Sequence, residues 1–185
     1  MKRMMIGLVV LWFFALVPLS AADRPMALAM SVGQRGGDFS LGAEVASPSL
    51  FDGMVAIHVG ADVQYKAGSV NGGDQEWYPY VLTSVGFQIT AVQTDWMRLY
   101  ASSAVLVFVP SPEVGSPWHV GGYGGFGFEF YFASRGSGSY YLEIGGAGTT
   151  AKASALAHAP YLSNGLTIKA GCRFPLWRKD QVEES

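Results

Sequence analysis

The sequence has few of the residues that build disulfides, metal sites or nucleic-acid surfaces. Cys172 is its one cysteine, so no internal disulfide can form, and no Cys/His cluster has metal-ligand spacing. Charged residues make up 14% of the chain, whereas about a quarter is usual in a soluble domain. The basic residues are dispersed and outnumbered by acidic ones, unlike a nucleic-acid surface. We therefore expect no cofactor, no metal and no nucleic-acid partner.

The chain also lacks an apolar run of transmembrane-helix length. It starts with the basic pair Lys2-Arg3, and the apolar run from Met4 reaches Pro18 after about 14 residues, against roughly 20 needed to span a bilayer. Ser20-Ala21-Ala22 then provides the small residues that a signal peptidase reads. We therefore predict a cleaved signal peptide over residues 1–22 and a secreted mature chain. Since no cysteine lies at the cleavage site, a lipoprotein anchor is not expected.

Apolar residues, aromatics and glycine are abundant in the rest of the chain, and they alternate with polar residues at a period of two. No window shows a helical stripe, and turn residues (Gly, Pro, Ser, Asn, Asp) separate eight extended segments. The expected strands are 26–34, 38–47, 53–66, 76–91, 96–109, 118–133, 139–150 and 164–174. Several of them reach the roughly 9–11 residues of a tilted membrane-spanning strand.

The two faces of each predicted strand differ in polarity. The residues on these faces favour a barrel in a membrane over a domain in water. The last strand sets Leu166, Ile168, Ala170, Cys172 and Phe174 against Thr167, Lys169, Gly171 and Arg173. The polar faces carry charges of both signs in mid-strand, as a narrow lumen does. Aromatic residues of the apolar faces form two expected girdles, with Phe39, Tyr65, Trp77 and Trp118 at the outer rim and Phe132, Tyr140 and Phe174 at the inner rim. A soluble all-β domain remains the alternative.

These patterns predict an all-β fold, an eight-stranded antiparallel up-and-down transmembrane β-barrel over residues 23–177. Only a closed barrel satisfies every backbone group in hydrocarbon, and eight strands leave a lumen that side chains can fill. A short charged tail, residues 178–185, would follow in the periplasm. We expect a monomer in the bacterial outer membrane, in contact with its lipid, with surface-exposed loops and both termini periplasmic.

The segment from Asn164 to Phe174 resembles the final strand of bacterial outer-membrane barrels, with matches at Ala170, Gly171, Arg173 and Phe174. Together with the signal peptide and the eight-strand layout, it makes the mature chain similar to the small OmpA, OmpX and OmpW barrels, and OmpW is the nearest of these. The resemblance implies that the barrel assembly machinery reads residues Lys169 to Phe174. The chain departs from the family pattern after Phe174, where further residues follow the aromatic at which the family usually stops.

Charged residues are expected low and midway in the lumen. They are Glu44, Arg98, Glu129, Glu143, Lys169 and Arg173. Counting out from the turn at Ser134–Ser139 places Glu129 nearly opposite Glu143, and the two arginines at similar heights beside them. Two interpretations remain open: a static polar plug, and a gate whose ion pairs exchange partners, as proposed for the OmpA-type family.

Bulky side chains are expected in the upper lumen, beside glycines that remove side-chain volume. They are Tyr78, Tyr80, Leu82, Leu106, Phe108 and Tyr123. Simple packing over the glycines is one interpretation. The other is an apolar pocket for a small hydrophobic ligand, which the OmpW resemblance implies.

The functional prediction is a narrow channel or binder for small hydrophobic molecules in the outer membrane. The alternative is a surface-exposed structural or adhesin barrel with a plugged lumen and no transport. A lipid-modifying enzyme of the outer leaflet is the least favoured class. None of His58, His119 and His158 stands in the His-x-Ser arrangement of lipid A deacylases, so we expect no catalytic residues.

Overall fold

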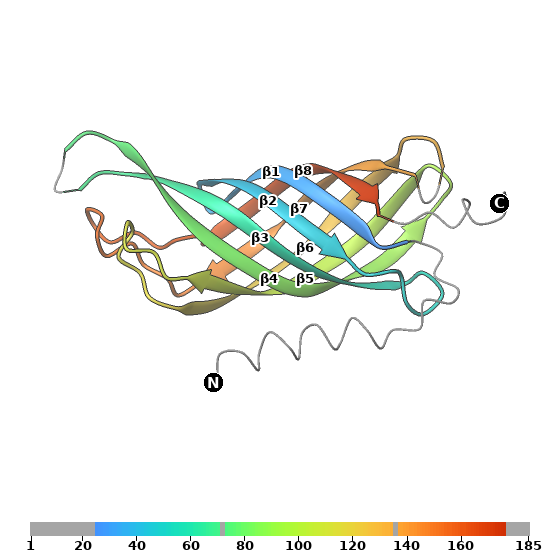
Figure 1. Ribbon diagram of the computed structural model, residues 1–185, viewed down its shortest axis with the longest axis horizontal. Coiled ribbons are helices and arrows are strands. Elements are labelled where there is room, and N and C mark those ends of the chain that lie inside the picture. Colours follow the sequence, from blue (N-terminus) through green and yellow to red (C-terminus); the bar gives the residue numbers. More distant parts are fainter. Residues whose placement is uncertain (1–24, 71–72, 135–136, 177–185) are drawn as a thin grey trace.

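The computed structural model describes residues 25–70, 73–134 and 137–176. The predicted signal peptide (1–22) and charged tail (178–185) lie outside these residues and stay predictions. Eight strands form a closed barrel in which each strand pairs with its sequence neighbours and β8 pairs with β1, all antiparallel (Figure 1). The strands are β1 (Ala27–Arg35), β2 (Asp38–Ala46), β3 (Val55–Gly68), β4 (Glu76–Gln93), β5 (Met97–Val109), β6 (His119–Tyr131), β7 (Ser139–Thr149) and β8 (Gly165–Pro175). The predicted closed all-β barrel is therefore confirmed.

The alternation of the sequence sets the two faces of the wall. Every strand begins and ends within two residues of its predicted bounds. Along β5 the inward residues Arg98, Tyr100 and Leu106 are buried, whereas the outward residue Val105 is 54% exposed. One irregularity lies near the end of β4, where the register with β5 shifts between Thr90 and Val92. This bulge was not predicted, and it extends β4 to Gln93.

The barrel wall is uneven in height. β1 and β2 have nine residues each, whereas β3 has 14 and β4 has 18. The β3–β4 ladder continues to Gly68 and Glu76, beyond the last β2–β3 pair at Phe39 and Tyr65. The β3–β4 hairpin therefore stands above its neighbours, and Figure 1 shows it projecting beyond the rest of that end of the barrel.

Exposed aromatic side chains gather at both rims, as the sequence predicts. At the end that carries the hairpin, Trp77 and Trp118 are exposed and the rings of Phe39 and Tyr65 lie 6.1 Å apart. At the other end, the ring of Tyr140 lies 5.1 Å from Phe130 and 6.1 Å from Phe132. Phe174 is also exposed there, and Trp96 adds an unpredicted ring 6.0 Å from Phe130. No helix in the described ranges has the length and hydropathy to cross a bilayer.

Candidate functional site

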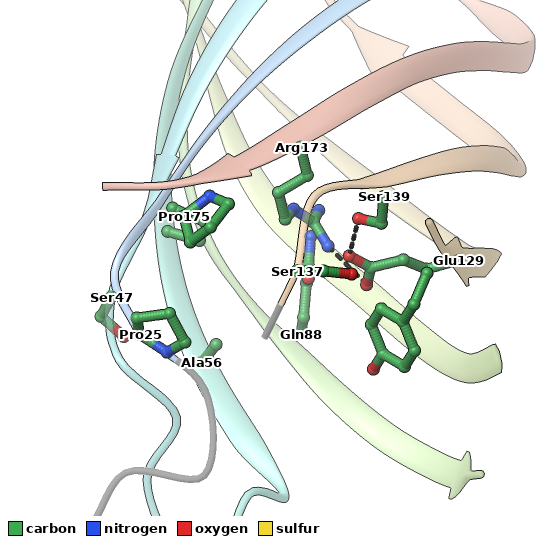
Figure 2. A pocket seen from close by; sticks show the side chains of 12 residues that line it. Pro25, Ser47, Ala56, Gln88, Glu129, Ser137, Ser139, Arg173 and Pro175 are labelled. Carbon is green, nitrogen blue, oxygen red and sulfur yellow. Dashed lines mark hydrogen bonds and ion pairs between the residues drawn. The ribbon is translucent and has the colours of Figure 1, made fainter. Parts of the chain in front are cut away.

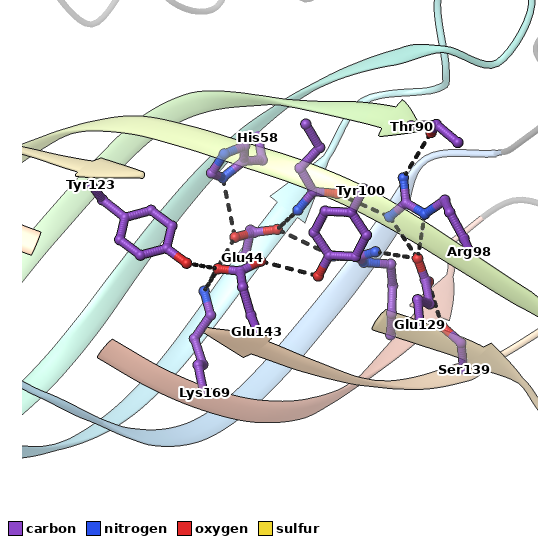
Figure 3. A network of polar contacts seen from close by, with 12 residues as sticks. Glu44, His58, Thr90, Arg98, Tyr100, Tyr123, Glu129, Ser139, Glu143 and Lys169 are labelled. Atoms are coloured by element: carbon purple, nitrogen blue, oxygen red, sulfur yellow. Dashed lines mark hydrogen bonds and ion pairs between the residues drawn. The ribbon is translucent and has the colours of Figure 1, made fainter. Parts of the chain in front are cut away.

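We call the barrel end that carries the β3–β4 hairpin the outer rim and the opposite end the inner rim. The lumen near the inner rim is centred on the Glu129 carboxylate of β6. Arg98 Nη2 of β5 lies 2.6 Å from Glu129 Oε2, and Arg173 Nη1 of β8 lies 2.8 Å from the same oxygen. Ser139 donates its hydroxyl hydrogen to Glu129 Oε1 at 2.6 Å (Figures 2 and 3). Arg98 also donates to Gln88 Oε1 at 3.1 Å, and its guanidinium lies over the Tyr100 ring. Both oxygens of the buried carboxylate are thereby satisfied, as buried charge requires.

A second cluster lies at mid-height around Glu143 of β7. Its carboxylate accepts hydrogen bonds from the hydroxyls of Tyr100, at 3.0 Å, and Tyr123, at 2.8 Å. Lys169 Nζ of β8 lies 3.6 Å from Glu143 and 3.8 Å from Glu44 of β2. One lysine therefore bridges two carboxylates that come from different strands (Figure 3).

Glu44 connects the two clusters. Its carboxylate lies 3.1 Å from His58 Nδ1 and 3.6 Å from Arg173 Nη2, and it accepts from Gln88 Nε2 at 3.3 Å. Arg173 and Gln88 also belong to the contacts around Arg98 and Glu129. All six predicted charged residues thus lie in one connected network.

The relative placement of the two glutamates corrects the expectation that they lie nearly opposite. Glu129 is paired with Tyr141, and Glu143 is paired with Gly127. The pairing of Tyr131 with Ser139 centres the turn earlier in the chain than the span 134–139 on which the count was based, and this shifts the register by two residues. The glutamates are therefore offset along the barrel. Glu129 forms ion pairs with both arginines, whereas Glu143 contacts Lys169 and accepts hydrogen bonds from two tyrosine hydroxyls.

A third polar group lies nearer the outer rim. Asp38 accepts from Lys66 Nζ at 2.8 Å, from the Tyr80 hydroxyl at 2.5 Å and from the Ser163 amide at 3.0 Å. Arg35 Nη2 lies 3.2 Å from Asp62 Oδ2. Arg35 lies one residue beyond the predicted strand 26–34, and Asp38 is the first residue of the predicted strand 38–47. The two form the terminal pair of the β1–β2 ladder.

The charges that form these luminal ion pairs balance. The carboxylates are Asp38, Glu44, Asp62, Glu129 and Glu143, and the basic side chains are Arg35, Lys66, Arg98, Lys169 and Arg173. Because each carboxylate has at least one basic partner, the polar lumen needs no added ion to neutralise it.

Above the charges, the predicted pocket residues are packed rather than open. Leu82 and Phe108 are fully buried, and the rings of Tyr80 and Phe108 stack at 5.2 Å. Their cluster is completed by loop residues, namely Val114 of the β5–β6 loop and Ala151, Ala153, Leu156 and Leu162 of the β7–β8 loop. Tyr78 packs against this cluster from the rim. We call this group the apolar cap.

Leu106 and Tyr123 belong to a second, smaller cluster with Ala104 and Ala147. Two glycines beside this cluster leave room for aromatic rings: a Cβ atom at Gly125 would overlap the Tyr123 hydroxyl, and one at Gly127 would overlap the Tyr100 ring. The expected role does not extend to Gly122 and Gly124, where a Cβ atom would meet nothing within 4 Å. Gly125 and Gly127 make room for the tyrosines that bind Glu143. The space is therefore occupied by side chains that belong to the polar network.

Hydrogen bonds hold the β7–β8 loop in the barrel mouth. Ser163 donates its amide to Asp38, and its hydroxyl lies 2.8 Å from the Tyr80 hydroxyl. Thr149 donates to the Leu162 carbonyl at 2.5 Å, and the Ala157 amide donates to the Ser69 carbonyl at 2.9 Å. The loop is thus tied to β2, to β4 and to Ser69, the residue that directly follows β3.

The inner end of the lumen is not closed in this way. A cavity of about 40 Å³ opens there, with Glu129, Arg173, Ser139 and Gln88 among its lining residues (Figure 2). A cavity of that size holds about one or two water molecules. The ion-pair network therefore meets the inner mouth, whereas the apolar cap separates it from the outer one.

The described residues contain no metal site, and the sequence matches no family model. Among the described residues, no group of His, Cys, Asp and Glu is arranged to hold a metal ion. His58 faces Glu44, and His119 Nδ1 lies 3.1 Å from the Thr150 hydroxyl at the rim. No protein-family model and no curated protein matches the sequence.

Proposed function

We propose that this chain is a bacterial outer-membrane β-barrel with a plugged lumen, which serves as a surface-exposed structural protein rather than as an open pore. The observation that carries the proposal is the contrast between the two faces of the wall. The charged side chains inside the barrel form ion pairs with one another, and the outward face is largely apolar.

The outward face supports the membrane location. Val32, Val85, Val120 and Leu166 come from four different strands, and each is about half exposed or more. In water, so large an apolar surface would be left without cover. Lipid covers such a surface, and the closed ladder leaves no unpaired edge in the hydrocarbon. The predicted signal peptide and the seam position of β8, the strand proposed to be read by the assembly machinery, fit the same location.

The interior supports a plug over a channel. A path for small hydrophobic molecules would have to cross the network of Glu44, Glu143 and Lys169, which is charged and buried. The apolar cap fills the upper lumen, where such a molecule would first bind. The channel or binder predicted from the family resemblance would therefore need the β7–β8 loop to leave the mouth.

Two measurements test the proposal separately. Purified protein should float with liposomes, show β-type circular dichroism in detergent and migrate differently on gels before and after heating. Protein that stays soluble in the periplasm without detergent would overturn the membrane location. In planar bilayers the inserted protein should give no steady conductance, and reproducible single-channel steps would overturn the plug.

A further inference from the structure

A groove on the outward face lies where β1 meets β8, close to the outer rim. It encloses about 230 Å³, and its lining includes Gln34, Gly36, Asn164, Leu166 and Ile168. The Gly36 amide donates to the Leu166 carbonyl at 2.8 Å, which fixes the β1–β2 turn against β8 and so sets the shape of the groove. Leu166 and Ile168 form its apolar part, and the amides of Gln34 and Asn164 form its polar part.

Gln34 is unusual for its position in the wall. Directly paired outward residues form a row across neighbouring strands, in the order Tyr65, Phe39, Gln34, Ile168 and Ile144. Gln34 is the one amide in a row of aromatic and branched apolar side chains. An amide that faces hydrocarbon without a partner is unfavourable by about 1–3 kcal/mol. Both Gln34 and Asn164 are exposed, so their hydrogen-bonding groups are free to meet a ligand on this surface.

The low wall at this seam places the two amides close to the outer rim, which on the proposed membrane location is the level of the lipid head groups. β1 is short, and its turn to β2 consists of Gly36 and Gly37, whereas the β3–β4 hairpin rises higher elsewhere. Apolar side chains lie directly next to the amides in the groove. A groove that is apolar on one side and amide-lined on the other fits a molecule with a hydrocarbon chain and a polar head.

We propose that this groove binds one outer-leaflet lipid with a hydroxyl-rich head group, such as a sugar. The acyl chain lies along Leu166 and Ile168, and the head-group hydroxyls exchange hydrogen bonds with Gln34 and Asn164. Side-chain amides both donate and accept, as sugar hydroxyls do. No basic side chain lines the groove, and a phosphate would call for one. This inference rests on the proposed membrane location.

The test uses the full chain inserted in phosphatidylcholine nanodiscs that contain a small share of glucosyl-diacylglycerol, followed by native mass spectrometry. The wild type should retain one glycolipid. The double variant Gln34→Leu/Asn164→Ala should retain about tenfold less, because each lost hydrogen bond is worth about 0.5–1.5 kcal/mol. Gln75→Leu, which removes an exposed amide near the hairpin tip, is the matched control and should retain the glycolipid as the wild type does.

The outcomes separate this inference from the proposed function. Failure of the wild type to insert would overturn the membrane location itself. Insertion with equal retention by wild type and double variant would overturn the groove as the site. Equal retention of chain-matched diacylglycerol would overturn head-group recognition, and cross-linking of two barrels through this seam would assign the groove to a second copy of the chain. Heat-dependent gel migration of each variant confirms that it is folded before the comparison.

Discussion

The two ends of the lumen are closed by different physical means. Near the inner rim, Glu129 is held by Arg98 and Arg173, and the network meets a small cavity at the mouth. Near the outer rim, loop side chains pack on Leu82 and Phe108 and leave these residues fully buried. Apolar packing depends on volume and tolerates repacking, whereas a buried ion pair depends on both partners being present. The inner end is therefore more sensitive to a single change, and the outer end is better able to move.

The largest effect is expected from breaking the inner network. Arg98→Met leaves the buried Glu129 with one arginine and should lower the free energy of unfolding in detergent by about 3–5 kcal/mol. The double variant Arg98→Met/Glu129→Gln should lose less than Arg98→Met alone, and a double-mutant cycle measures this coupling. Coupling near zero would contradict the network.

Truncation in the apolar cap should have a smaller effect. Phe108→Ala removes a buried ring and should lower the free energy of unfolding by about 3 kcal/mol, since the loops can partly collapse into the space. Any cavity that remains is apolar and should take up xenon or benzene. Val105→Ala, on the outward face of the same strand, is the control and should change stability little. A loss for Val105→Ala as large as that for Phe108→Ala would contradict the inside and outside assignment.

Release of the β7–β8 loop should be a more local event. Asp38→Asn removes the charge that accepts from Lys66, Tyr80 and Ser163, and it should weaken this contact by about 1–2 kcal/mol. Hydrogen exchange should then quicken over residues 150–164, with the barrel strands unchanged. Asp74→Asn, at the exposed hairpin tip, should leave that exchange as it is. Faster exchange throughout the barrel would show that Asp38 stabilises the fold rather than the loop.

The smallest effect is expected at Tyr123. Tyr123→Phe removes one of the two hydroxyls that donate to Glu143 and should reduce stability by about 1 kcal/mol, because Tyr100 and Lys169 remain in place. Chemical unfolding in detergent measures the change. A loss as large as that of Arg98→Met would contradict this expectation, because Glu143 would then depend on one tyrosine hydroxyl as strongly as Glu129 depends on Arg98.

The strands and the facing of their residues could be predicted because period-two alternation is a local property. A choice such as Val105 outward and Leu106 inward needs only neighbouring residues once one face is known. The pairing of the charged residues with one another could not be predicted in the same way. Arg98 meets Glu129 because the β5–β6 register pairs the two residues, whereas the offset of Glu143 follows from the position of the turn before Ser139.

The outer closure was missed for a different reason. Val114 lies in a connection rich in proline and serine, and Leu156 and Leu162 lie in one rich in alanine, where no periodic pattern marks a buried residue. Arg35 was left just outside its predicted strand because two glycines follow it, but the β1–β2 ladder continues to the Arg35–Asp38 pair. A tight turn between nine-residue strands was the signal that both side chains still point inward.

The contacts between distant strands have a kinetic consequence. Arg173 of β8 reaches Glu44 of β2, and Ser163 binds Asp38 across 125 positions of the chain. Neither contact can form while the sheet is open, so both belong to the last step, when β8 joins β1. Interactions that are absent from the folding transition state slow unfolding without hastening folding. These contacts in the lumen should therefore slow the unfolding of the finished barrel once β8 has paired with β1.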